Sequence, residues 1–119
     1  MELKRVVVTG LGTINPLGKN IEEFWENLCN GVSGAGPITR FDASRFKTQF
    51  ACEVKNFDPG EYLEKKEIPK HDMYAQFAYV AAAQALKHSG LDLDKIDKDE
   101  VGVIWGAGIG GLNLSLIHI

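Results

Sequence analysis

Residues 101–112 read VGVIWGAGIGGL, an apolar run that leads into a cluster of glycines. The run from Val101 to Trp105 has the length and apolar character of a strand buried in a parallel sheet. The glycines of residues 106–111 satisfy the pattern G-x-G-x-x-G, in which backbone amides and a helix N-terminus can hold a pyrophosphate. This stretch predicts an α/β fold and raises nucleotide binding as one hypothesis.

Upstream of this stretch, predicted strands and helices alternate. Residues 6–8 are three valines before a glycine turn, which predicts a second interior strand. Asn20 begins a predicted helix that has apolar residues on one face and ends at Gly31. Apolar residues alternate along residues 50–55, which predicts a short strand with one covered face.

The longest predicted helix covers about residues 69–88, where no helix breaker intervenes before Ser89-Gly90. Its middle is apolar on nearly every side, which is typical of a helix packed within the protein. Its small alanines also permit close approach of another backbone. The order strand, helix, strand, helix, strand predicts an α/β architecture with right-handed crossovers.

The composition is that of a small globular protein, with 119 residues, 45% of them hydrophobic, and a formal net charge of −3. The length predicts one domain at most, and the charge offers no general attraction to nucleic acid or to a membrane surface. Without an apolar run of 18 residues or a signal peptide, we expect a cytoplasmic protein that spans no membrane. Two cysteines, Cys29 and Cys52, are too few for a metal cluster, and we expect reduced thiols.

The dinucleotide fingerprint fits the chain poorly. It normally belongs to the first turn between a strand and a helix, and an acidic residue follows about 20 positions later. Here, about 100 residues of other α/β structure precede Gly106, and only eight residues follow Gly111. A nucleotide-binding α/β domain is therefore only an alternative interpretation of this chain.

Four motifs in one collinear order are more specific than the glycine cluster. They are VVVTGLGTINPLG at residues 6–18, FWENLCNGVSG at 24–34, RFDAS at 40–44 and VGVIWGAGIGGL at 101–112. Together they resemble the opening of the β-ketoacyl-acyl-carrier-protein synthases over residues 3–112. Gly-Ile-Gly-Gly at residues 108–111 resembles the synthase II type more than the synthase I type.

The resemblance implies a thiolase-like fold, in which two similar α/β halves form five αβαβα layers and the enzyme is a homodimer. Residues 1–112 would be the N-terminal portion of the first half, whereas residues 113–119 are an atypical apolar tail that indicates truncation or foreign sequence. The family condenses acyl-ACP with malonyl-ACP, with decarboxylation, in fatty-acid elongation. The implied partner is therefore acyl carrier protein, and no cofactor or metal is implied.

By the same resemblance, the nucleophilic cysteine and the two histidines of the family lie beyond residue 119. We therefore expect no catalytic residue in this chain and no activity from the chain alone. Cys52 has an apolar position in its predicted strand, which predicts a buried, unreactive thiol. His88 is expected to be a favourable cation at a helix C-terminus. A non-catalytic ketosynthase-like protein, such as a polyketide chain-length subunit, is a further alternative.

Two sites are implied by the resemblance. Gly108, Ile109 and Gly110 would line the acyl pocket, with Ile109 as the contact residue, and core packing of Ile109 is the alternative. Lys66 and Lys70 would help to dock the acidic carrier protein. Since Glu64 and Glu67 dilute the positive field, a solvated charged helix start is the alternative to docking. Pro69 departs from the basic residue that the family often has there.

Overall fold

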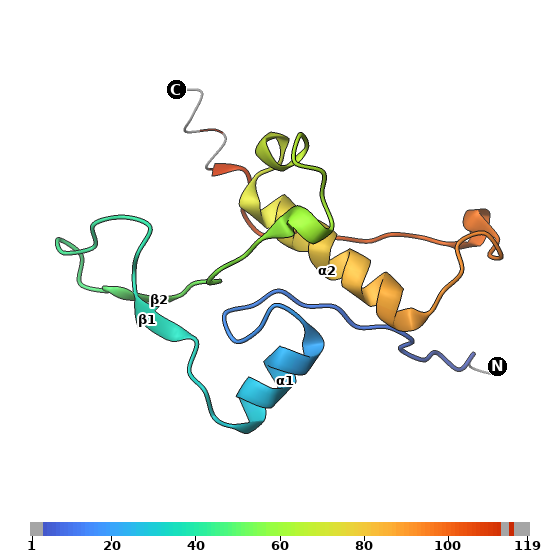
Figure 1. Cartoon of the computed structure of the whole chain (residues 1–119), viewed down its shortest axis with the longest axis horizontal. Helices are drawn as coiled ribbons and strands as arrows, with labels where there is room; N and C mark the ends of the chain where they lie inside the picture. The colour runs from blue at the N-terminus through green and yellow to red at the C-terminus, as the bar shows by residue number, and fades with distance from the viewer. Residues whose placement is uncertain (1–3, 113–114, 116–119) are drawn as a thin grey trace. The chain divides into compact units, whose positions relative to one another are not determined.

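The computed structural model describes residues 4–112 and residue 115. This part of the chain contains the helices α1 (Ile21–Cys29) and α2 (Met73–Ser89) and the strands β1 (Ala35–Pro37) and β2 (Phe50–Cys52) (Figure 1). Short 3-10 turns cover Pro59–Glu61, Ile68–Lys70 and Lys98–Glu100. The chain divides into two compact units. The hairpin unit is Thr13–Asp58, and the terminal unit is Met1–Gly12 together with Pro59–Ile119.

Helix α1 of the hairpin unit forms where its capping residues predict it. The Asn20 side chain accepts a hydrogen bond from the Glu23 amide at 2.8 Å, and the Glu23 carboxylate accepts one from the Lys19 amide at 2.8 Å. These bonds satisfy amides that a helix start leaves open. Beyond the other end, Gly31 has a φ of 67°, the left-handed conformation that favours glycine. The predicted helix is confirmed at both ends.

The loop before α1 is closed by its own hydrogen bonds. The Asn15 side chain accepts from the amides of Leu17 and Gly18, at 2.8 and 3.2 Å. Asn27 on α1 donates to the Leu17 carbonyl at 2.6 Å. Gly18 is buried, and a β-carbon there would collide with the backbone of Phe24. The loop is therefore a scaffold that fixes the start of α1.

Strands β1 and β2 form an antiparallel ribbon in which Ala35 lies opposite Cys52 and Pro37 lies opposite Phe50. The strand predicted over residues 50–55 is confirmed only for its first half. Strand β1 is not predicted, because Gly36-Pro37 is typical of a connection. The predicted burial is wrong, since Phe50 is 66% exposed and Cys52 is also exposed. A two-stranded ribbon has no second layer in this unit to cover that face.

A carboxylate ties together the two segments that flank the ribbon. The Thr39 hydroxyl donates to Glu53 Oε2 at 2.6 Å, and the Thr39 amide donates to Glu53 Oε1 at 3.2 Å. The hydroxyl bond first, and then the amide bond, hold the pKa of Glu53 below its ordinary value of 4.5, and the charge of Arg40 acts in the same direction. Glu53 is therefore held in its charged form.

In the terminal unit, α2 begins at Met73 rather than at the predicted Pro69. Asp72 caps the helix by accepting a hydrogen bond from the Met73 amide, and Pro69 lies in a separate 3-10 turn. The buried Gln76 side chain donates to the Ile68 carbonyl at 3.0 Å. This bond ties the turn to α2. The later start of the helix follows from the extended backbone of Asp72, which separates the turn from Met73.

The predicted packing of α2 on nearly every side is only partly confirmed. Val80 and Ala81 are buried, but Tyr74 and Tyr79 are 44% and 53% exposed. One stripe of α2 is therefore open. The helix ends before Gly90, which has a φ of 64° and follows the predicted boundary. Over the described ranges, no helix is long and apolar enough to cross a bilayer.

The close approach that the α2 alanines permit is confirmed. Gly10 and Gly12 lie directly against the backbone of α2. A β-carbon on Gly10 would collide with the Ala85 carbonyl, and one on Gly12 would collide with the Ala81 carbonyl. Glycine is therefore required at both positions, for close packing rather than for phosphate binding.

His88 lies in the last turn of α2, as predicted, but its role differs from the prediction. Its Nδ1 accepts a hydrogen bond from the Leu11 amide at 3.0 Å. A ring nitrogen that accepts such a bond carries no proton. The bond therefore requires a ring that is neutral at Nδ1, and it gives His88 the role of an acceptor rather than that of a cation at the helix end.

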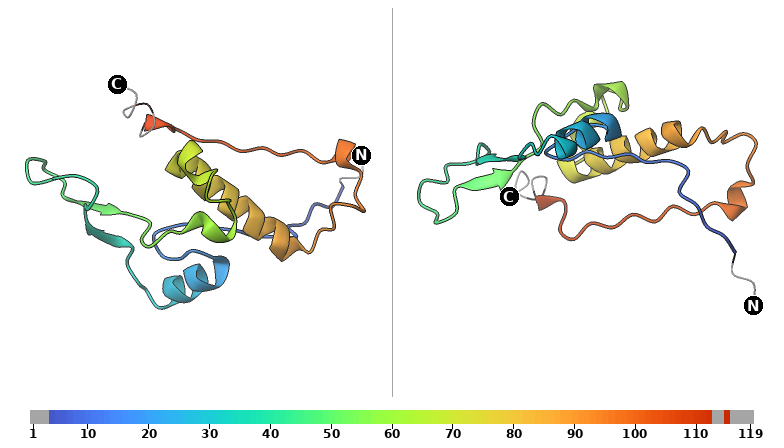
Figure 2. Two further views of the ribbon diagram at one scale, coloured as in Figure 1. Left: turned by 45° about the horizontal axis from the view of Figure 1, so that its top comes forward. Right: turned by 90° about the horizontal axis from the view of Figure 1, so that it is seen from below.

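The two predicted interior strands are extended but unpaired. Residues 6–8 and 101–105 form no strand, and among the described residues the only sheet is the β1–β2 ribbon. Val6 is 90% exposed and Ile104 is 98% exposed. Figure 2 shows residues 101–110 as extended coil alongside α2. An interior strand needs hydrogen-bonding neighbours, and without them the predicted parallel sheet does not form in this part of the chain.

Candidate functional site

The predicted acyl-pocket residues Gly108, Ile109 and Gly110 follow the extended segment of the terminal unit. Gly110 packs on the aromatic ring of Tyr74, where a β-carbon would lie 2.7 Å from the nearest ring atom. Gly111 has a φ of 78°, which favours glycine. Gly108 has open space around it. The local structure therefore requires the last two glycines of the cluster but not Gly108.

Ile109 has neither of the surroundings that the sequence predicts for it. Its side chain is 81% exposed, so it is not packed in a core. It also does not line the cavity described next. The acyl-pocket role of Ile109 stays a prediction.

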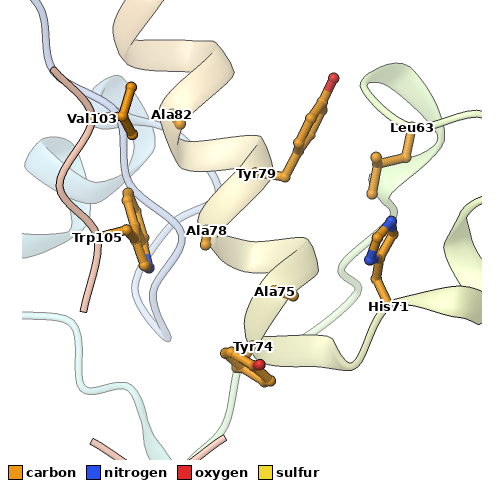
Figure 3. Close-up of a pocket in the computed structure, with 9 residues that line it drawn as sticks. All are labelled: Leu63, His71, Tyr74, Ala75, Ala78, Tyr79, Ala82, Val103 and Trp105. Atoms are coloured by element: carbon orange, nitrogen blue, oxygen red, sulfur yellow. The ribbon is translucent and has the colours of Figure 1, made fainter. Parts of the chain in front are cut away.

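A cavity of about 370 Å³ lies along the open stripe of α2 in the terminal unit (Figure 3). Val103 and Trp105 line it from the extended segment, and Leu63 and His71 line it from the chain before α2. The lining residues from α2 recur at helical spacing and are Tyr74, Ala75, Ala78, Tyr79 and Ala82. This cavity is not predicted from the sequence, although the helical spacing of the two tyrosines and three alanines is a signal for it.

The walls of this cavity are chemically suited to apolar contact. Alanine, leucine, valine and aromatic carbon dominate the lining, and its polar groups are His71, the indole of Trp105 and the two tyrosine hydroxyls. His71 Nε2 lies 3.9 Å from Glu67 Oε2, an ion pair only when the ring is protonated. The lining contains no serine, threonine or cysteine. The cavity can therefore bind apolar groups, but its lining offers neither a thiol nor an aliphatic hydroxyl to carry an acyl group.

The predicted docking lysines are accessible and already paired. The side chains of Lys66 and Lys70 are well exposed. Lys66 Nζ lies 2.7 Å from Glu64 Oε2, and Lys70 Nζ lies 2.8 Å from Glu67 Oε1. Exposed pairs of this kind contribute about 0–1 kcal/mol, so a carboxylate-rich partner can displace the local acidic residues at little cost.

Both cysteines are free and exposed. Cys29 is the last residue of α1, and Cys52 is the last residue of β2. The predicted burial of Cys52 is wrong because the ribbon is uncovered. Neither thiol lines the cavity of the terminal unit.

Comparison with known proteins agrees with the motifs. A family described as "Beta-ketoacyl synthase, N-terminal domain" matches residues 3–117. The chain is 50% identical to 3-oxoacyl-[acyl-carrier-protein] synthase 2 of Coxiella burnetii, over 94% of this chain and 27% of that protein. It is 46% identical to the synthase 2 of Vibrio harveyi, over 96% of this chain and 28% of that protein. The chain thus spans about a quarter of the length of these relatives.

Solved structures give the same result. The ishigamide ketosynthase/chain length factor matches with a TM-score of 0.68 and 39% identity, over 76% of this chain and 22% of that chain. A type II polyketide-synthase ketosynthase, solved in complex with its acyl-carrier protein, matches with a TM-score of 0.59 and 28% identity, over 80% of this chain and 23% of that chain. The predicted α/β, thiolase-like fold class is therefore confirmed, although its sheet is not formed here. The chain belongs to the β-ketoacyl synthase family, as part of the N-terminal domain.

Proposed function

We propose that this chain is part of a type II 3-oxoacyl-acyl-carrier-protein synthase, which joins acyl-ACP to malonyl-ACP with loss of carbon dioxide in fatty-acid elongation. The main support for this proposal is that the chain is 41–50% identical, over 92–96% of its length, to proteins named for that activity. Because the chain spans only about a quarter of those proteins, the reaction would belong to a longer polypeptide. Family membership gives no support to the nucleotide-binding alternative.

In the proposed reaction, a cysteine thiolate attacks the acyl thioester and releases the carrier-protein thiol. Decarboxylation of malonyl-carrier protein leaves a carbanion, which attacks the acyl-cysteine and expels the thiolate. We expect this cysteine and two assisting histidines outside residues 1–119. The chain alone should therefore be inactive, and the position of both Cys29 and Cys52 outside the lining of the apolar cavity supports this expectation.

Mass spectrometry of the chain after incubation with acyl-ACP tests this assignment. We expect no acyl adduct on Cys29 or Cys52, whereas the full-length enzyme should gain one acyl group. The double variant Cys29→Ser and Cys52→Ser in the full-length enzyme should keep that adduct. Acylation of either thiol in the chain alone would contradict the proposal.

Ile109 is proposed to contact the growing acyl chain. The support is its exposed side chain and its neighbour Gly110, whose contact with Tyr74 fixes where this turn meets α2. In the full-length enzyme, Ile109→Phe should lower kcat/KM for long acyl-ACP about tenfold relative to short acyl-ACP, because a bulkier wall excludes methylenes. Ile109→Val is the control and should keep the chain-length profile of the wild type. Equal chain-length profiles in the wild type and Ile109→Phe would remove this role.

Lys66 and Lys70 are proposed to dock acyl carrier protein. Charge reversal to Glu at both should raise KM for carrier-bound substrate roughly tenfold and reduce its dependence on salt, with little change in kcat. Lys95→Glu is a matched control, because Lys95 also pairs with a carboxylate three residues away, Asp92, at 2.8 Å. If Lys95→Glu raised the KM equally, the overall charge of the protein, and not Lys66 and Lys70, would govern binding of the carrier protein.

A second candidate is a non-catalytic chain-length subunit. It is favoured by the match to a ketosynthase/chain length factor at 39% identity. The residue encoded at the nucleophile position of the full-length gene distinguishes the two, since a synthase requires cysteine there. We further propose that the full-length protein is a cytoplasmic homodimer, which size-exclusion chromatography with light scattering and cell fractionation would test.

A further inference from the structure

In the terminal unit, a hydrogen bond joins the segment before residue 13 to the last turn of α2. The Leu11 amide donates to His88 Nδ1 at 3.0 Å, across 77 residues of sequence. On either side of Leu11, Gly10 and Gly12 touch the α2 backbone so closely that no β-carbon fits. The histidine bond therefore adds a directional side-chain contact to this close packing on the α2 backbone.

This bond exists only when the imidazole is neutral at Nδ1. Histidine is the side chain whose charge ordinarily changes between pH 5 and 8. Protonation would place an N–H on His88 opposite the N–H of Leu11, so that two donors would face each other. The Leu11 amide would then have to turn to water, and the ring would have to rotate away.

Charged residues of both signs lie near His88 and Leu11 along the chain. Lys87 precedes His88 on α2, and Lys4 and Arg5 lie upstream on the segment that packs against the helix. After the helix come Asp92 and Asp94, and Asp92 is paired with Lys95 at 2.8 Å. On the two elements that form the contact, the nearest charges along the chain are therefore cationic.

We propose that His88 is a pH-sensitive latch, which holds residues 10–12 on α2 while the ring is neutral and releases them when Nδ1 gains a proton. The transferred proton comes from solvent, and no covalent bond changes. Because the bond requires the neutral ring, the latch is closed at the alkaline end of the histidine range and opens as pH falls. This is a conformational property of the chain and does not depend on its proposed activity.

NMR of the 119-residue chain between pH 8 and pH 5 tests the latch. In the wild type, the His88 ring at pH 8 should be the tautomer with its proton on Nε2. The Leu11 amide signal should move with the same midpoint as the His88 ring. The protection of the Leu11 amide from exchange, corrected for the intrinsic rate, should fall about five- to tenfold as the ring protonates, which corresponds to the loss of one net hydrogen bond.

Three variants separate the latch from simple packing. His88→Asn keeps an acceptor near the Nδ1 position but cannot titrate, so the protection of Leu11 should persist at all pH values. His88→Ala should leave Leu11 unprotected throughout. His71→Asn, at the other end of α2, should keep the wild-type response. The proposal would be overturned if the Leu11 amide signal did not change as His88 titrates, or if the ring carried its proton on Nδ1 at pH 8. It would also be overturned if His88→Asn lost the protection of the Leu11 amide as pH falls.

Discussion

The two helices and the two valine-containing segments, residues 6–8 and 101–105, are equally regular in sequence, yet only the helices form. A helix satisfies most of its amides and carbonyls within itself, and its caps supply the remainder. A strand depends entirely on neighbours for the same groups. The contrast shows which elements this stretch of sequence specifies by itself and which need a sheet assembled around them.

The largest expected effect comes from the contact that the first extended segment does make. Gly12→Ala would push a β-carbon into the Ala81 carbonyl, a backbone atom that cannot move aside. We expect a loss of about 2–3 kcal/mol in the free energy of unfolding, measured by urea unfolding followed at 222 nm. Gly106→Ala is the control, because nothing lies within 4 Å of its β-carbon position. Equal unfolding midpoints would mean that residues 10–12 do not pack on α2.

A smaller effect is expected on the second extended segment. Gly110→Ala would place a methyl group against the Tyr74 ring, and a side chain can rotate away where a backbone carbonyl cannot. We expect a loss of about 1 kcal/mol in the same unfolding experiment and a change in Tyr74 ring signals by NMR. Gly108→Ala, which enters open space, should do neither. If both variants behave alike, the glycine cluster does not contact α2.

Removal of a cap tests the autonomy of the helices. Asn20→Ala deletes the acceptor for the Glu23 amide, and such caps contribute about 1 kcal/mol. Lower helicity by circular dichroism and faster amide exchange at Glu23 should follow. Asn20→Ser retains an acceptor and should stay close to the wild type. An unchanged Asn20→Ala would show that packing, rather than capping, decides where α1 begins.

The smallest effect is expected on the ribbon, through Glu53. Its pKa lies below 4.5 in the folded chain, so its bonds stabilise the fold at neutral pH and this contribution is lost as pH falls through the folded value. Thr39→Val removes the hydroxyl donor and should raise the pKa of Glu53 toward 4.5, as measured by carbon NMR of the carboxyl group. Thr39→Ser should keep the wild-type value. If the pKa of Glu53 did not change in Thr39→Val, the Thr39 hydroxyl would not be the cause of the lowered pKa.

Local chemistry explains which parts of the fold could be predicted. Asn20 and Gly31 bracket α1 because a cap and a left-handed glycine act over one turn of chain. The start of α2 could not be predicted from periodicity, because the extended backbone at Asp72 separates the turn that contains Pro69 from the helix. Strand β1 was missed because Gly36-Pro37 pairs only through the opposing β2.

The candidate site was less predictable for a different reason. Motif order identified the family, because several patterns at fixed distances are specific together. Burial could not be predicted for Cys52 or Ile109, since it depends on layers that residues 4–112 do not supply. The position of His88 at the end of α2 could be predicted from the sequence. Its hydrogen bond could not, because its partner Leu11 lies 77 residues away.

The packing of Gly10 and Gly12 on α2 also sets an order of events during synthesis. The first segment leaves the ribosome early, but the helix surface that it fits is completed only when residues near His88 have been added. At about 5–20 residues per second, a separation of 77 residues corresponds to a wait of about 4–15 s. For that interval Gly10 and Gly12 have no helix backbone to pack against, so the contact that joins this segment to α2 forms late in synthesis.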